Sequence, residues 1–206
     1  MDTPSTPTGE GTVGLRWLLA RPELGLRPLH LTDGDPALSW AHAIELEDPS
    51  PWLRGAGLVL TTGLRLPRSR AGQAAYVARL VAAGARALGF GTGFRFASVP
   101  PGVQEACRDL GLPLVEVPLP TPFLGVVQAV SDRLGEQRRQ RLQEALATQQ
   151  QLTRDALRGG APAVATSLAR ALGGGVLVLD PDLGVLARAG SRPPTIAAVA
   201  AETRGR

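Results

Sequence analysis

The sequence contains no lysine: all 22 of its basic residues are arginines. Without lysine there is no P-loop lysine, no Schiff-base chemistry and no kinase-type Lys–Glu pair. One cysteine and two histidines are too few for a Cys/His zinc site, and one cysteine excludes an internal disulfide. The motifs G-x-S-x-G, H-E-x-x-H and C-x-x-C are also missing. We therefore expect a protein that is not an enzyme and that carries no metal and no cofactor.

Aromatic residues are scarce too, at 4%, so Leu, Val and Ala must fill the core. No run of about 18 uncharged apolar residues occurs, and we expect no membrane span. The lone cysteine and the lack of a basic-then-apolar leader favour a cytoplasmic location. A length of 206 residues allows one full domain and part of a second, and 44% apolar content is typical of a globular chain.

The net charge of +4 is unevenly distributed. Residues 1–60 hold 8 acidic and 4 basic residues, whereas residues 61–206 hold 10 acidic and 18 basic ones. This excess of arginine is modest for a nucleic-acid surface. Direct DNA binding by this chain is therefore not favoured.

Residues 12–122 show the pattern of an α/β domain, after a Pro/Thr/Gly-rich segment at 1–11 that we expect to be a disordered tail. Thr12 is expected to cap a helix to about residue 20, and strands are expected at 26–31 and 38–46. Short apolar runs then alternate with amphipathic helices. The predicted order is strand 57–61, helix 70–83, strand 87–90, helix 101–110 and strand 114–117. This order predicts a mainly parallel sheet with flanking helices.

A long helix is expected from Phe123 to Leu157, after the Thr121-Pro122 start signal. Its second part is rich in Gln and Arg and retains only a thin line of apolar residues. The eight-residue step from Leu134 to Leu142 excludes a strict heptad repeat, so a solvated amphipathic helix remains an alternative. We favour a homodimer, because such a helix is too long merely to close one domain. The expected dimer residues are Val127, Val130, Leu134, Leu142, Leu146 and Leu152.

Residues 159–206 resemble only a part of a domain. Gly159-Gly160 is expected to end the long helix, and a short helix at 163–172, a hairpin of strands 176–179 and 185–189 and a terminal helix from Thr195 follow. This partial α+β segment is too small for its own core, so we expect the start of a second, truncated domain.

Two polar segments follow predicted parallel strands. Ligands of open α/β sheets bind outside the carboxyl ends of strands. Thr61, Thr62 and Gly63 can present hydroxyl and N–H groups there, although the sequence alone favours an ordinary strand-to-loop turn with a helix cap. Gly91, Thr92 and Gly93 follow the neighbouring strand; they have the composition of a flexible loop, and they are also candidates to line the same pocket.

Four other residues carry candidate chemistry. Glu45 and Arg54 flank an Asp-Pro-Ser-Pro turn, where they can form an ion pair or shape a pocket wall. His42 is a possible general base but has no nucleophile at a known spacing. Cys107 falls on the apolar face of its helix and is expected in the core. An enzyme acting on a purine-like amide would depend on His42 or Glu45 and is the least favoured hypothesis.

Three segments together resemble the N-terminal domain of PucR-type purine-catabolism regulators. They are the run from Ser39 to Leu46 with the following Asp48-Pro49, the run Trp52-Leu53-Arg54-Gly55, and the run from Leu58 to Gly63. The resemblance covers about residues 12–135. The long helix and the segment 179–186 resemble the linker and the start of the GAF-like middle domain of these regulators. Gly57 departs from the family, which usually has an acidic residue there.

The resemblance implies the sensor and dimerisation region of a bacterial transcription regulator. Its effector would be a small, nitrogen-rich metabolite bound by the residues named above. In such proteins DNA is bound by a helix-turn-helix domain at the far C-terminus, which is absent from this chain. The alternative is a dimerisation or scaffold module without a ligand.

Overall fold

The computed structural model describes residues 11–53 and 55–196. The predicted tail at 1–11 lies outside the described residues, apart from Gly11. The chain divides into two compact units, residues 1–138 and residues 139–206, and each is described by itself.

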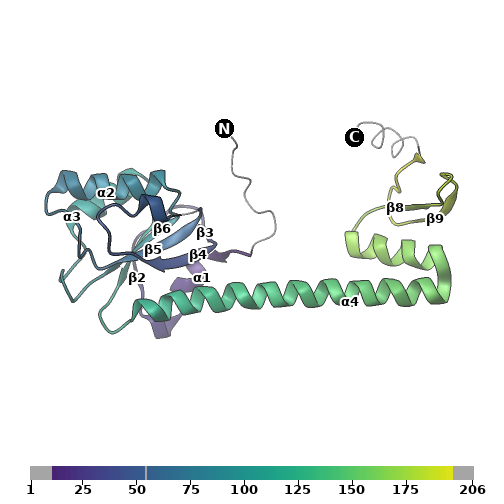
Figure 1. The fold of residues 1–206 in the computed structure, drawn as a ribbon, viewed down its shortest axis with the longest axis horizontal. Helices are drawn as coiled ribbons and strands as arrows, with labels where there is room; N and C mark the ends of the chain where they lie inside the picture. The colour runs from purple at the N-terminus through teal and green to yellow at the C-terminus, as the bar shows by residue number, and fades with distance from the viewer. Residues whose placement is uncertain (1–10, 54, 197–206) are drawn as a thin grey trace. The chain divides into compact units, whose positions relative to one another are not determined.

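A five-stranded sheet forms the centre of the first unit (Figure 1), with the strand order β2-β7-β6-β5-β4. The four strands from β4 to β7 are parallel, and β2 pairs with β7 in the antiparallel direction. The strands are β2 (Arg27–His30), β4 (Trp40–Ala43), β5 (Gly57–Thr61), β6 (Ala87–Gly91) and β7 (Leu114–Val117). The prediction of a mainly parallel α/β sheet is confirmed.

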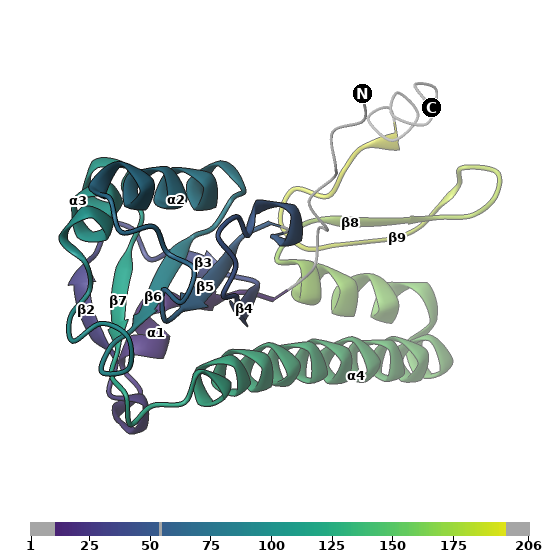
Figure 2. The same cartoon turned by 60° about the vertical axis from the view of Figure 1, so that its left-hand side comes forward.

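Helices cover both faces of this sheet, so the unit has three layers (Figures 1 and 2). One face packs against α2 (Arg70–Ala82) and α3 (Pro101–Asp109). The other face packs against α1 (Leu15–Leu19) and the start of α4 (Phe123–Leu172). Because both β-α-β crossovers place their helices on the same face, the parallel strands follow one another in sequence order across the sheet.

The alternation of side chains along β5 explains why this strand is continuously apolar. Val59 points into the core beneath α2 and α3, whereas Leu58 and Leu60 point into the core beneath α1 and α4. All three side chains are buried. On β6, Gly89 gives Leu60 room, because a Cβ there would lie 2.5 Å from the Leu60 Cδ2 atom. A strand buried on both faces needs apolar residues at every position.

The N-terminal elements differ from the prediction. Val13 and Gly14 form β1 (Val13–Gly14), which pairs with β3 (Ala37–Leu38), and α1 begins only at Leu15. Thr12 does not cap this helix. The Asp35 carboxylate accepts a hydrogen bond from the Arg16 N–H at 2.9 Å instead. The strand predicted at 38–46 is divided into β3 and β4, and short 3₁₀ turns occupy η1 (Pro22–Leu24) and η2 (Ser50–Trp52).

The start of α4 belongs to the core of the first unit. Val130 and Leu134 are buried there, and Val127 packs against the same core. Three of the six residues predicted to form a dimer interface therefore contact their own domain. Leu142 and Leu146 are exposed, and Leu152 is partly exposed.

In the second unit the helical segment bends sharply at Gly160, whose φ of 59° and ψ of −152° suit only glycine. The Gly159-Gly160 break is thus observed as a kink. The part of α4 after Gly160 returns beside the part before it, and the Ser167 hydroxyl donates a hydrogen bond to the Asp155 carboxylate. The predicted hairpin is present as β8 (Val176–Leu179) and β9 (Val185–Ala189). The terminal helix predicted from Thr195 lies mostly outside the described residues.

Candidate functional site

The carboxyl ends of the four parallel strands lie along one edge of the sheet. Ala43, Thr61, Gly91 and Val117 are the last residues of these strands in order. Two described residues of the predicted ligand site, Thr61 and Gly91, are themselves the last residues of strands. The other described ones lie in the loops that follow the strands; they are Glu45, Thr62, Gly63, Thr92 and Gly93. The edge is the position at which open α/β sheets bind ligands.

Glu45 holds the turn from Thr61 to Leu64 in place. Its carboxylate accepts hydrogen bonds from the Thr61 hydroxyl at 2.9 Å, from the Thr62 N–H at 2.6 Å and from the Leu64 N–H at 3.1 Å. The Gly63 N–H donates in turn to the Thr61 hydroxyl at 3.1 Å. Three of the donors that the sequence offered to a ligand are thus bonded within the chain: the Thr61 hydroxyl and the N–H groups of Thr62 and Gly63. The ligand contacts predicted for Thr61 and Gly63, and the pocket wall predicted for Glu45, stay predictions.

The inner side of this turn is packed tightly. Thr61 is only 3% exposed. Gly63 has a φ of +73°, and a Cβ there would lie 2.8 Å from the Phe90 Cζ atom, so only glycine fits. Burial raises the pKa of the nearby Tyr76 to about 12, although the Thr61 hydroxyl opposes this shift. The Tyr76 phenol is therefore neutral at physiological pH.

The outer side of the same edge contains a hollow of about 210 Å³, which we call the strand-end pocket. Thr62, Gly91 and Thr92 line it, so the structure brings together three of the predicted ligand-binding residues. The remaining lining residues come from the loop after β6, from the end of β7 and the loop after it, and from the start of α4; they are Phe94, Val117, Pro118, Leu119, Thr121 and Phe123. Gly93 lies beside the pocket, because a Cβ there would lie 2.8 Å from the Leu119 Cβ atom.

Thr92 connects the strand-end pocket to a charged pair on the sheet. Its hydroxyl donates a hydrogen bond to the Glu116 carboxylate at 2.6 Å. The Arg27 guanidinium lies 3.8 Å from the same carboxylate. The Glu116 side chain is 17% exposed and that of Arg27 is 68% exposed, so the carboxylate is the more enclosed member of the pair.

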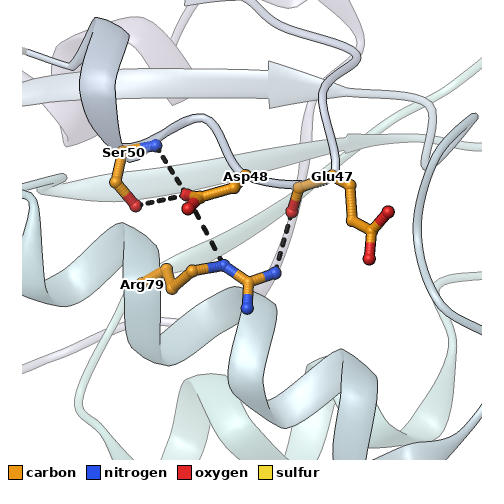
Figure 3. A network of polar contacts seen from close by, with 4 residues as sticks. All are labelled: Glu47, Asp48, Ser50 and Arg79. Carbon is orange, nitrogen blue, oxygen red and sulfur yellow. Dashed lines mark hydrogen bonds and ion pairs between the residues drawn. The ribbon is translucent and has the colours of Figure 1, made fainter.

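The loop that precedes β5 is fastened to α2 by Arg79 (Figure 3). The Arg79 guanidinium donates to the Glu47 carbonyl oxygen at 2.8 Å and lies 3.6 Å from the Asp48 carboxylate. Asp48 also accepts hydrogen bonds from the Ser50 N–H at 3.0 Å and from its hydroxyl at 2.5 Å. Arg54, which the sequence placed at the pocket wall, lies outside the described residues.

The residues considered for catalysis do not form a site. His42 is exposed on the edge strand β4, beside a separate hollow of about 260 Å³ that Trp40 and Trp52 also line. Cys107 is buried, as predicted, and burial raises the pKa of its thiol to about 12. Within residues 11–53 and 55–196, no three His, Cys, Asp or Glu residues gather to hold a metal ion. No helix in this part of the chain is long and apolar enough to cross a membrane.

The sequence did not point to the loop after β7, which supplies Pro118, Leu119 and Thr121 to the pocket. The signal was available, since this loop follows a predicted parallel strand just as the two selected loops do. In this loop, Thr121-Pro122 indicates the start of the long helix and draws attention away from a site. Phe94 was missed because a single aromatic residue in a glycine-rich loop has no periodicity.

The structure defines a three-layer α/β domain that has a hollow at its strand ends and is joined to a long helix. A family model described as "Purine catabolism regulatory protein-like family" matches residues 17–134, which is more than half of the chain, and the chain belongs to this family. The chain is also 30% identical over 121 residues to "Transcriptional activator PmfR" of Paenarthrobacter nicotinovorans. That alignment covers 57% of this chain and 25% of the relative, so the chain spans about a quarter of the relative's length. No solved structure matches.

The departure at Gly57 has a local cause. Gly57 is paired with Trp40 across β5 and β4, and a Cβ at this position would overlap the Trp40 indole. An acidic side chain cannot occupy this place while Trp40 packs over it.

Proposed function

We propose that this chain is the sensor and dimerisation region of a bacterial transcription regulator that responds to a small, nitrogen-rich metabolite. Membership in the purine catabolism regulatory protein-like family and the similarity to a transcriptional activator support this proposal. The chain acts by binding rather than by catalysis, in the cytoplasm. Its DNA contacts are made by a further domain that is not in this sequence.

One observation carries the proposal: Phe123 both lines the strand-end pocket and begins α4. The Phe123 ring lies against the floor of the pocket, since a Cβ on Gly91 would come within 2.8 Å of its Cζ atom. A ligand that displaces this ring therefore acts on the first turn of the helix. Ligand binding can shift a population of helix positions only through such a differential contact.

The dimer contact is proposed for the part of α4 beyond the first unit. Leu142 and Leu146 are 61% and 49% exposed, and Leu152 is partly exposed. Leu142 and Leu146 lie four residues apart and so share one face of the helix. Large apolar side chains exposed on a Gln/Arg-rich helix are expected to be covered by a partner, here a second copy of the chain.

The first test is thermal stability of the full chain with a panel of purines, ureides and related small molecules at millimolar concentration. A ligand at 100 times its Kd adds about 2.7 kcal/mol to the free energy of unfolding. The variant Thr62→Val should bind the stabilising compound more weakly, because it removes a pocket hydroxyl. The control Thr153→Val changes a threonine on the exposed part of α4 and should bind as the wild type does.

A scaffold module without a ligand is the second candidate. It is favoured by the hydrogen bonds of Glu45, which use the Thr61 hydroxyl and the Thr62 N–H within the chain. This candidate predicts a dimer that no compound stabilises. It also predicts that Thr62→Val changes the stability of the fold alone.

A further inference from the structure

We propose that the strand-end pocket selects an uncharged, planar molecule with N–H donors, of the amide class. This inference rests on the proposed function, since it names the ligand of the same pocket. Three features of the lining carry it: the direction of the threonine hydroxyl bonds, the charges behind them and the shape of the walls.

Three threonines line the pocket, and the hydroxyls of two of them have already donated their only proton. The Thr92 hydroxyl donates to the Glu116 carboxylate at 2.6 Å, and the Thr121 hydroxyl donates to the Leu24 carbonyl oxygen at 2.7 Å. A hydroxyl that has donated its proton can only accept further hydrogen bonds. A ligand that satisfies Thr92 and Thr121 must therefore bring its own donors.

The third lining threonine is Thr62, whose hydroxyl makes no hydrogen bond to a described residue and is able to donate. One donor beside two acceptors complements an amide, in which a carbonyl oxygen lies next to N–H groups. An ester or a carboxylate has the carbonyl oxygen but lacks the donors.

The charge behind the lining disfavours an anion. The Glu45 carboxylate lies 2.6 Å from the Thr62 nitrogen, and the Glu116 carboxylate lies 2.6 Å from the Thr92 hydroxyl. Among the described residues, none that lines the pocket has a basic side chain. Arg27 is near Glu116, but its guanidinium is largely exposed and screened by solvent.

The walls accept a flat ring. Phe94, Val117, Pro118, Leu119 and Phe123 form most of the lining. Phe94 and Leu119 are 76% and 63% exposed at the rim, which leaves apolar surface for a ligand to cover. A volume of about 210 Å³ lies below the usual range for drug-sized ligands and so limits the ligand to a small molecule.

Three matched probes test this assignment: benzamide, methyl benzoate and benzoate. They share the ring and differ in donor and charge. Each is titrated into the ¹⁵N-labelled full chain, and the amide signals of Gly91, Thr92 and Phe94 are followed. We expect benzamide to shift these signals with an affinity about 5-fold higher than that of methyl benzoate, the value of one neutral hydrogen bond. Benzoate should bind still more weakly.

A variant separates the donor requirement from general binding. Thr121→Val removes one acceptor and should reduce the preference for benzamide over methyl benzoate, whereas Thr153→Val should leave it unchanged. Equal affinities for the amide and the ester, or tighter binding of benzoate, would overturn the amide assignment. If none of the three probes shifts the pocket signals, the assignment is also wrong. The proposed function then stands only if another compound of the stability panel binds.

Discussion

Replacing Glu45 with alanine should destabilise the α/β domain by an amount that the structure allows us to estimate. The carboxylate accepts three hydrogen bonds, from the Thr61 hydroxyl and from the N–H groups of Thr62 and Leu64. A hydrogen bond to a charged group contributes about 1.5–3 kcal/mol. Leu64 is exposed and can bond to water instead, so we count only the two bonds to Thr61 and Thr62, at the lower end of the range. The expected loss is about 3 kcal/mol.

The measurement is calorimetric unfolding of the full chain, followed at the transition of the α/β domain. For a domain of this size, 3 kcal/mol corresponds to a decrease in Tm of roughly 10 °C. Glu45→Gln keeps one acceptor oxygen but turns an NH₂ group toward a backbone donor, so it should fall between Glu45→Ala and the wild type. Glu47→Ala is the matched control, because the Glu47 side chain points away from Arg79 and only its carbonyl oxygen is bonded (Figure 3). A decrease for Glu45→Ala no larger than that for Glu47→Ala would refute the proposed role of Glu45.

Three further predictions follow from the same structure. The double variant Leu142→Glu/Leu146→Glu should convert a dimer into a monomer in light scattering with no loss of helix content, because both side chains are exposed within the chain. The buried Cys107 thiol, whose pKa burial raises to about 12, should react with a disulfide reagent at pH 8 only after unfolding; rapid reaction of the native chain would contradict its burial. Hydrogen bonds from Ser50 hold the pKa of Asp48 below its ordinary value of 3.8, so its contribution to stability is present above that pH and decreases as the pH falls through the folded-state pKa. Asp48→Asn should weaken the dependence of the free energy of unfolding on pH in this acidic range. An unchanged pH dependence in the variant would exclude a contribution from Asp48.

The regular elements of the α/β domain could be predicted because their signals are local. The strand at 57–61 is continuously apolar and bounded by glycines, and the helix from residue 70 has an apolar face at helical spacing. Pro101 marks the start of the next helix, and Gly111 lies just beyond its end. Each of these signals depends on neighbours in the chain and not on the rest of the fold.

The errors occurred where distant residues compete for the same backbone. Thr12 has the chemistry of a helix cap, yet Asp35, 19 residues beyond the Arg16 donor, caps α1 because β1 pairs with β3. The strand predicted at 26–31 was found, but its antiparallel direction depends on its partner β7. A cap or a strand partner from another part of the chain leaves no trace in the local pattern.

In the candidate site too, some features follow from local sequence and others depend on contacts between distant residues. By itself, the sequence determined the strand ends and therefore the edge at which Thr62, Gly91 and Thr92 meet. Only the tertiary structure decided that Glu45 uses the donors of the neighbouring turn, and that the loop after β7 and the first residue of α4, Phe123, complete the pocket. The physical reason is range: periodicity and turn chemistry act over a few residues, whereas a hydrogen bond or a pocket wall requires atoms that folding alone brings within about 3–4 Å.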